Sequence, residues 1–596
     1  SVTRYIPEFT MADPRYTDIT VRMLLNHSSG LMGGTLVNSF LFADPQEDNA
    51  TSHLLERLSK QTLQAAPGAY SVYSNDSYTL AELVIERVSQ MSFTEFIDTY
   101  IKPSLKLEDT YTPRNAFDTS RLAKTYLGEE TRALPQETAA IIGTGGMYSN
   151  AMDLATFGGS FCGDALLSEA SREAMMSKEY LRGMWAEDSE DDAIAYGLGW
   201  DNVHMYPFNQ NDIRALVKGG DTLVYHAGLV VLPEYNLACA VLSSGGASSY
   251  NEAAAAQILI QALQEQGVSL TIHDTLPAAH AAAMPESYQK LSGFYGSTTG
   301  ILEISIEDGG TLTIHNPAMP TSDAQTLYYH SDGSFRDNDS TLLLKLIQEE
   351  NGQIYLYQKS YVPLPDMAPM AIANYYFERL PEYPVEQDVQ SAWNARNGKL
   401  YLAANEKYTS AFYAMGAVFA SIGFLPGMDG YLMNNQLQSA DTATTFLQIP
   451  GMGSRDSGTV HIVEYQGVEY IEQNGSLYMD ASALAAVHPN GKSVCTIQPD
   501  GYARWYAIGE AAGSLMQVSL PKNGAFCVYD ASFQMVASSW TYGDTSVTLP
   551  ENGVIVFAGD SGARFQLTMT QPAPQEQPDI PVEQETQPEL QALPAA

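Results

Sequence analysis

The residue pattern with the clearest chemical potential is a tyrosine and an asparagine separated by one serine, at Tyr73 and Asn75. A Tyr-x-Asn triplet in a loop before a helix can present a phenol and an amide side by side. A phenol has an ordinary pKa of about 10 and is a poor base at neutral pH unless nearby cations favour the phenolate. This interpretation therefore requires a lysine close to Tyr73. The alternative is an ordinary turn, the usual role of such a triplet.

A second candidate lies far along the chain, where Lys218, Gly219, Gly220 and Asp221 open an apolar, strand-like run. The lysine supplies a cation, and the two glycines let a substrate approach the backbone closely. Lys218 could hold a substrate carboxylate and could favour the phenolate of Tyr73. The alternative, for these residues taken alone, is a turn with a solvated lysine.

The elements that would position these residues form a mixed α/β region over residues 1–268. Leucine and valine recur at helical spacing over 79–90, which predicts a helix directly after the Tyr-x-Asn triplet. Ser92 and Glu95 have the spacing of a capping box for a second helix. Later in the region the pattern predicts two apolar strands and a closing helix, over 223–231, 237–242 and 251–264.

With their surroundings, the two motifs resemble the penicillin-recognising serine hydrolases, which include class C β-lactamases, DD-peptidases and related esterases. The resemblance covers residues 1–265, a little under half of the chain. Lys218 stands where the family has Lys-Thr-Gly or His-x-Gly. The matching segments, in the family's order, are 19–31 (ITVRMLLNHSSGL), 73–75 (YSN), 101–105 (IKPSL), 145–149 (GGMYS), 196–200 (YGLGW) and 218–220 (KGG).

The resemblance implies an α/β (α+β) domain with an antiparallel sheet flanked by helices, and acyl-enzyme chemistry on an amide, ester or lactam. Tyr73 would transfer the proton and Lys218 would be its electrostatic partner. Asn75 would orient the substrate amide. A backbone N–H just after Gly219 and Gly220, with Asp221 as the expected donor, would stabilise the oxyanion. No metal or organic cofactor is implied.

The family's nucleophile, the serine of a Ser-x-x-Lys motif, belongs upstream of the segment that the first residues resemble. We therefore expect the printed chain to lack it, together with much of its helix, and to be inactive by itself. Two literal matches begin at Ser287 and Ser519, beyond the hydrolase-like region. The second has a proline where a helix is needed, so neither is expected to be the nucleophile.

Other polar clusters have plainer interpretations. His27 and His226 lie within or beside matching segments without metal-ligand spacing, so packing or loop support is expected. The acidic run 187–192 lacks the pattern of a calcium loop and predicts a solvated surface loop. The Gly-Asp-Ser-Gly at 559–562 predicts a hairpin turn. The four cysteines are too few and too scattered for a disulfide framework or a zinc site.

Beyond the hydrolase-like region, short strands separated by Gly, Asp and Asn turns predict all-β accessory domains. The uncharged run at 411–425 is shorter than the roughly 20 residues that span a bilayer, so we expect a buried core segment. The Pro-, Gln- and Glu-rich end is expected to be disordered. The expected units are a barrel or sandwich at 285–385, a β-rich segment at 386–455, a β-rich domain at 456–570 and a tail at 571–596.

The composition of the chain limits the classes of molecule that it could bind. The chain of 596 residues has 69 acidic and 30 basic side chains, a formal net charge of −39. Such a surface disfavours nucleic acid and anionic membranes, which both require clustered cations. With the resemblance, this composition predicts an extracytoplasmic protein whose partner is a small-molecule or peptide substrate, possibly derived from the cell wall. The alternative is a non-catalytic cell-surface binding protein that keeps the hydrolase-like fold.

Overall fold

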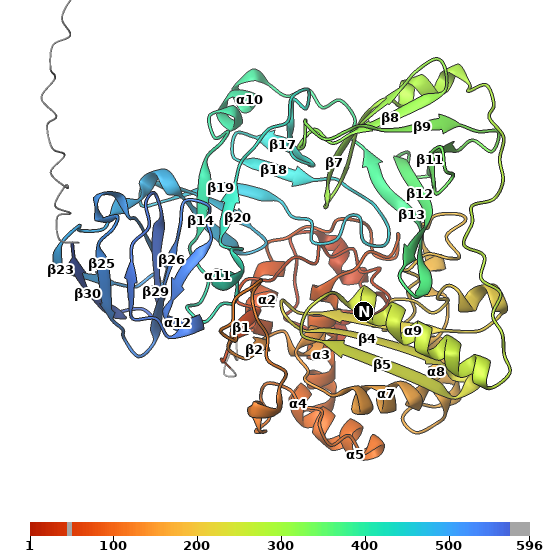
Figure 1. The fold of residues 1–596 in the computed structure, drawn as a ribbon, viewed down its shortest axis with the longest axis horizontal. Coiled ribbons are helices and arrows are strands. Elements are labelled where there is room, and N and C mark those ends of the chain that lie inside the picture. The colour runs from red at the N-terminus through yellow and green to blue at the C-terminus, as the bar shows by residue number, and fades with distance from the viewer. Residues whose placement is uncertain (45–49, 572–596) are drawn as a thin grey trace, which may run out of the picture.

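The computed structural model describes residues 1–44 and 50–571. The amino-terminal part is an α/β unit whose centre is a three-stranded antiparallel sheet in the order β3-β4-β5. Its strands are β3 (Leu216–Asp221), β4 (His226–Leu232) and β5 (Leu237–Ser243). Figure 1 shows this sheet beside the long helix α9 (Ser248–Glu265).

Helices cover both faces of this sheet because its strands are apolar on both sides. Val217 and Val230 are buried against α9, whereas Leu216 and Leu229 are buried on the opposite face. Helix α7 (Ala151–Gly159) lies on that second face. Side chains alternate along a strand, so Lys218 points to the same face as Leu216 and Leu229.

The remaining helices of this unit all precede β3 in the sequence. A small antiparallel pair, β1 (Phe40–Phe42) and β2 (Glu137–Ala139), accompanies them. The helix predicted at 79–90 begins earlier, at Asn75, and the capping box of Ser92 and Glu95 is formed. The helices are α1 (Val21–Leu25), α2 (Ala50–Leu58), α3 (Asn75–Ser89), α4 (Phe93–Phe96), α5 (Lys102–Leu105), α6 (Ile142–Gly145) and α8 (Glu169–Met175).

An eight-stranded closed barrel follows the α/β unit. Alternating side chains fill its interior, with Tyr295, Leu312, Leu327 and Phe335 fully buried. The strands are β6 (Gly293–Ser297), β7 (Gly300–Ile306), β8 (Thr311–His315), β9 (Gln325–Tyr329), β10 (Phe335–Arg336), β11 (Leu342–Gln348), β12 (Ile354–Leu364) and β13 (Met367–Arg379).

An eight-stranded sheet lies between the barrel and the last domain (Figure 1). It spans residues 400–480 and so includes residues on both sides of the boundary expected at 455. Three short helices accompany the C-terminal sheets: α10 (Gln387–Asn394), α11 (Phe412–Met415) and α12 (Ser539–Tyr542). The strands are β14 (Leu400–Ala403), β15 (Phe419–Ser421), β16 (Tyr431–Leu432), β17 (Asn435–Ser439), β18 (Thr442–Thr445), β19 (Val460–Tyr465), β20 (Val468–Gln473) and β21 (Ser476–Asp480).

The last domain packs a five-stranded sheet against a four-stranded sheet around one apolar core. The turn at 559–562 joins strands of the two different sheets, so the hairpin predicted there is wrong. The first sheet has β22 (Ala485–Ala486), β24 (Arg504–Ala507), β26 (Gly524–Tyr529), β27 (Met535–Ser538) and β29 (Val554–Gly559). The second has β23 (Gly491–Thr496), β25 (Leu515–Ser519), β28 (Ser546–Thr548) and β30 (Arg564–Thr570).

Two further predictions meet the structure here. The uncharged run 411–425 forms the short elements α11 and β15, and no helix among the described residues is long and apolar enough to cross a membrane. The acidic run is solvated only in part: Glu187, Asp188 and Glu190 are exposed, as predicted, whereas Asp191 and Asp192 are buried. Asp192 is buried and accepts hydrogen bonds from Ala373 N–H (2.8 Å) and Asn374 Nδ2 (3.0 Å) of the barrel. Nearly all of the tail at 571–596 lies outside the described residues.

Candidate active site

Tyr73 and Asn75 flank the start of α3. Between them, Ser74 is the N-cap, and its side chain accepts a hydrogen bond from the Ser77 N–H. This cap ends the extended segment and starts the helix, which is the usual role of serine at that position. Ser74 is fully buried, while Tyr73 and Asn75 remain half-buried. The phenol and the amide are therefore held in place by a buried residue between them.

His27 packs against the Tyr73 ring. Its imidazole stacks on the Tyr73 ring with centroids 4.5 Å apart, and its Nδ1 accepts a hydrogen bond from Ser74 N–H at 3.0 Å. Burial, together with the nearby charges of Lys218 and Arg455, holds the pKa of His27 well below its ordinary value. His27 is therefore neutral, and its place agrees with the packing role expected from the sequence.

Lys218 lies next to Tyr73 although 145 positions separate them. Its Nζ is 5.1 Å from the centroid of the Tyr73 ring. The Nζ also donates to both carboxylate oxygens of Asp201, at 2.8 and 3.0 Å. Burial alone would lower the pKa of Lys218, but Asp201 and the Tyr73 and Tyr78 phenols raise it above its ordinary value. Lys218 therefore carries a stable positive charge beside the phenol.

Asp201 is the functional residue that the sequence analysis missed. It accepts from Lys218 and also from the Gly219 N–H at 3.1 Å, so it fixes both the cation and the strand that carries it. Its only signal in the sequence is its place directly after the segment 196–200. The role of this carboxylate becomes visible only in the fold, which brings it within hydrogen-bond distance of Lys218.

The backbone after Lys218 faces the site. The Val217 N–H bonds Asn202 and the Gly219 N–H bonds Asp201, so both point away from β4. Strand alternation directs the Asp221 N–H the same way. The Asp221 side chain instead accepts from Ser248 N–H (2.8 Å) and contacts His226. The Asp221 N–H therefore points away from β4, and its role as the oxyanion donor stays a prediction.

Gly219 is required by a close neighbour rather than by its backbone angles. A Cβ at this position would lie 2.1 Å from a carboxylate oxygen of Glu252 on α9. Burial raises the pKa of Glu252 to about 8, with Asp201 adding to the increase. At Gly220, by contrast, a Cβ would only touch Ala227 at 4.0 Å. Packing against α9 thus explains the glycine at position 219, while the approach of a substrate to the two glycines stays a prediction.

A comparison with known proteins decides the family. The model of the beta-lactamase family, described as "Beta-lactamase", matches residues 1–263. Residues 1–263 belong to the beta-lactamase family. This domain is 28% identical over 219 residues to Penicillin-binding protein 4* of Bacillus subtilis (strain 168), an alignment that covers 33% of this chain and 45% of the relative. The chain thus spans less than half of that relative's length.

Several solved structures are similar to the chain. SurE is 19% identical, with a TM-score of 0.40, over 64% of this chain and 84% of its own. The octameric penicillin-binding protein homologue from Pyrococcus abyssi is 18% identical, with a TM-score of 0.34, over 63% and 84%. The D-amino acid amidase from Ochrobactrum anthropi SV3 in complex with L-phenylalanine is 18% identical, with a TM-score of 0.36, over 45% and 76%.

An apolar hollow of about 250 Å³ opens beside Lys218 in the beta-lactamase domain. Aromatic side chains form much of its wall, with Phe161 and Trp200 in edge-to-face contact at 4.9 Å between centroids. The cation of Lys218 and the backbone of Gly219 stand at its polar side. The hollow can take an apolar group next to a charged one.

Neither literal Ser-x-x-Lys match lies in the beta-lactamase domain. Ser287 is in the short 3-10 helix Glu286–Leu291, whose Tyr288 packs against the barrel core. Ser519 ends β25 in the last domain. The Gly-rich stretch at 143–146 packs against α3, where Gly143 N–H donates to Glu82 at 2.7 Å. Among the described residues, no cluster of His, Cys, Asp or Glu has the arrangement of a metal site.

Proposed function

We propose that the beta-lactamase domain is a serine hydrolase that cleaves an amide, ester or lactam through an acyl-enzyme. One observation carries the proposal: Lys218 Nζ, kept charged by Asp201, lies 5.1 Å from the centre of the Tyr73 ring. The proton-transfer role proposed for Tyr73 requires such a cation close to the phenol.

The reaction would run in two steps. The hydroxyl of the family's Ser-x-x-Lys serine adds to the substrate carbonyl carbon. Tyr73 takes the hydroxyl proton and passes it to the leaving nitrogen or oxygen, and the bond to the leaving group breaks. Water then attacks the acyl carbon and gives a proton to Tyr73, the acyl–serine bond breaks, and Tyr73 returns the proton to the serine oxygen. Asn75 would orient the substrate, and the Asp221 N–H would stabilise the oxyanion. The hollow beside Lys218 would accept an apolar substituent.

Covalent labelling tests this proposal. The full-length gene product is treated with a fluorescent penicillin and, separately, with a fluorophosphonate, and the modified residue is mapped by mass spectrometry. We expect one modified serine, followed three positions later by lysine. Absence of labelling by both reagents, or labelling only at Ser287 or Ser519, would contradict the proposal.

The location follows the same chemistry. We propose an extracytoplasmic site of action with a cell-wall-derived amide or peptide as substrate, in agreement with the acidic composition and the family. Fractionation of the producing cells, with the protein detected by antibody, tests the location. Recovery only with cytoplasmic markers would overturn it.

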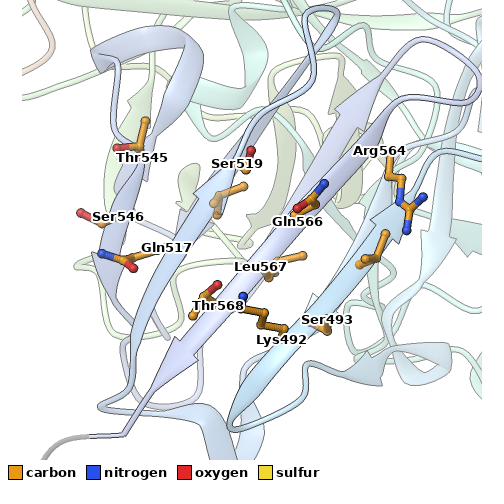
Figure 2. Close-up of a pocket in the computed structure, with 12 residues that line it drawn as sticks. Lys492, Ser493, Gln517, Ser519, Thr545, Ser546, Arg564, Gln566, Leu567 and Thr568 are labelled. Carbon is orange, nitrogen blue, oxygen red and sulfur yellow. The ribbon is translucent and has the colours of Figure 1, made fainter.

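A second candidate function is supported by the last domain. The exposed face of the sheet β23-β30-β25-β28 has a hollow of about 560 Å³. Figure 2 shows polar side chains across these strands, with Lys492 and Arg564 at one side. None of the twelve lining residues is Asp or Glu, in a chain with 69 acidic residues. Neither cation forms an ion pair in the described part of the chain.

This face suits an acidic polysaccharide, because hydroxyl and amide groups bind sugar hydroxyls and the two cations bind carboxylates. We expect the full chain to bind polygalacturonate, and the double variant Lys492→Ala/Arg564→Ala to bind at least tenfold more weakly in affinity electrophoresis. A matched double variant, Lys60→Ala/Arg121→Ala, should bind like the wild type. Equal binding by both double variants, or no binding by the wild type, would refute this function.

A further inference from the structure

A segment of the C-terminal β-rich part pairs with the backbone beside Tyr73. Residues 449–457 lie in the connection between β18 and β19 and are called here the 449–457 segment. Gly451 N–H donates to Ser71 O at 2.8 Å, and Tyr73 N–H donates to Gly451 O at 3.0 Å. These two bonds form a parallel bridge between Val72 and Gly451. The segment is therefore paired with the Tyr73 backbone as a strand would be.

Two further contacts hold the segment in place. The Tyr196 hydroxyl donates to the same Gly451 carbonyl at 3.0 Å. Gly451 has φ +81°, a conformation that favours glycine. Gln64 Nε2 bonds both Ser454 Oγ and the Leu447 carbonyl, the latter at 3.2 Å. These hydrogen bonds come from three separate parts of the beta-lactamase domain, and together they fix the position of the segment.

The segment brings Arg455 to Tyr73. The guanidinium carbon lies 4.6 Å from the centroid of the Tyr73 ring, closer than Lys218 Nζ. His27 stacks on the same ring. Asp456, the next residue, accepts from Arg455 Nε at 2.8 Å. The phenol ring is thus in contact with an imidazole and a guanidinium from distant parts of the chain.

The charges around the phenol leave Arg455 an electrostatic role. His27 is neutral, and burial keeps the neighbouring Tyr78 and Tyr196 phenols uncharged by raising their pKa. The positive charge at Tyr73 therefore comes from two residues, each with a carboxylate partner. Lys218 is paired with Asp201, and Arg455 with Asp456.

Asp456 adds the opposing charge. Its Oδ1 is buried and has no hydrogen-bond partner among the described residues. Burial raises the pKa of Asp456, while Arg455 lowers it. The nearby Asp76, whose pKa burial raises to about 7, is repelled by Asp456 in turn. Arg455 is therefore paired with a buried carboxylate next to the phenol.

We propose that Arg455 is a positioning residue of the active site, supplied by the C-terminal β-rich part, which packs its guanidinium on the Tyr73 ring and favours its phenolate. The 449–457 segment makes the β-rich part a component of the catalytic unit. This inference rests on the proposed function for its catalytic meaning, but its electrostatic content can be measured without catalysis.

The test is the ultraviolet absorbance of tyrosinate as pH is raised, measured on the chain as printed. Each variant is compared with the same variant carrying Tyr73→Phe, so that the other tyrosines cancel. In Arg455→Ala we expect the Tyr73 signal to move to higher pH by roughly half a unit to one unit, because a cation is lost and Asp456 is left unbalanced. Arg455→Lys should restore most of the wild-type position.

Asp456→Asn gives the opposite sign. It removes the opposing carboxylate while asparagine tolerates the left-handed backbone at this position, φ +56°. The Tyr73 signal should then move to lower pH. A contact that only supports the fold would not move the two variants in opposite directions. Arg564→Ala, an exposed cation of the last domain, is the control and should match the wild type.

The outcomes separate this inference from the proposed function. An unmoved signal in Arg455→Ala, or shifts of equal sign in Arg455→Ala and Asp456→Asn, would overturn the inference. In the active full-length protein, Arg455→Ala should lower kcat about tenfold with little change in KM, and Arg455→Lys should recover it. If the full-length wild type shows no acyl transfer while the opposite shifts persist, the proposed function fails and the electrostatic role of Arg455 stands.

Discussion

At the scale of single residues, the site depends on the cation of Lys218, whose charge is stabilised by the carboxylate of Asp201. Lys218 is about one-third exposed, yet Asp201 holds it with two hydrogen bonds. Tyr73, Asn75 and Lys218 could all be found in the sequence because their motifs are local. Asp201 and Arg455 could not, because their roles depend on which segments fold against Tyr73.

The charge of Lys218 leads to a prediction about substrate choice. Lys218→Ala removes the cation near the expected carboxylate of an anionic substrate, so we expect kcat/KM to fall about 10²-fold for an anionic amide. A neutral ester should lose clearly less. Steady-state kinetics on both substrates make the comparison, with Lys60→Ala, an exposed cation paired with Glu56, as the control.

Equal losses on the two substrates would mean that Lys218 acts only through the phenol of Tyr73. Activity like the wild type on both would remove Lys218 from the mechanism.

At the scale of elements, the sequence predicts local features better than boundaries. The capping box at Ser92 and the closing helix α9 were found from their patterns because neighbouring residues decide them. The eight-stranded sheet across residue 455 was not, because the pairing of β18 with β19 joins strands separated by the 449–457 segment. Pairing across a long loop leaves no periodic trace.

The cap of α3 gives the prediction at this scale. Ser74 is buried and its side chain satisfies the Ser77 N–H, so Ser74→Ala should lower the free energy of unfolding by about 1 kcal/mol. Ser168→Ala removes the same type of cap from the more exposed helix α8 and serves as the control. Urea denaturation of both variants provides the measurement.

The loss of stability in Ser74→Ala should be accompanied by lower activity, because Tyr73 is less well positioned. The loss of stability in Ser168→Ala should leave the activity unchanged. Equal behaviour of the two variants in both stability and activity would show that Ser74 does nothing special for the site.

At the scale of the whole molecule, the β-rich part is joined to the beta-lactamase domain by buried polar contacts. Asp192 binds the backbone of β13, Trp540 Nε1 donates to Phe42 O at 2.8 Å, and the 449–457 segment pairs with the backbone at Val72. The sequence predicted an α/β domain followed by β domains, and the structure confirms that order. It could not predict the contacts, because an acidic run looks solvated until a partner covers it.

The measurement that tests the central claim most directly is the rate of covalent labelling of the full-length protein by a fluorescent penicillin in wild type and Tyr73→Phe. We predict that Tyr73→Phe slows labelling by about 10²- to 10⁴-fold while the fold is kept, because the proton-transfer group is lost. Tyr250→Phe, an exposed tyrosine on α9, should label at the wild-type rate. Wild-type labelling in Tyr73→Phe would contradict the account.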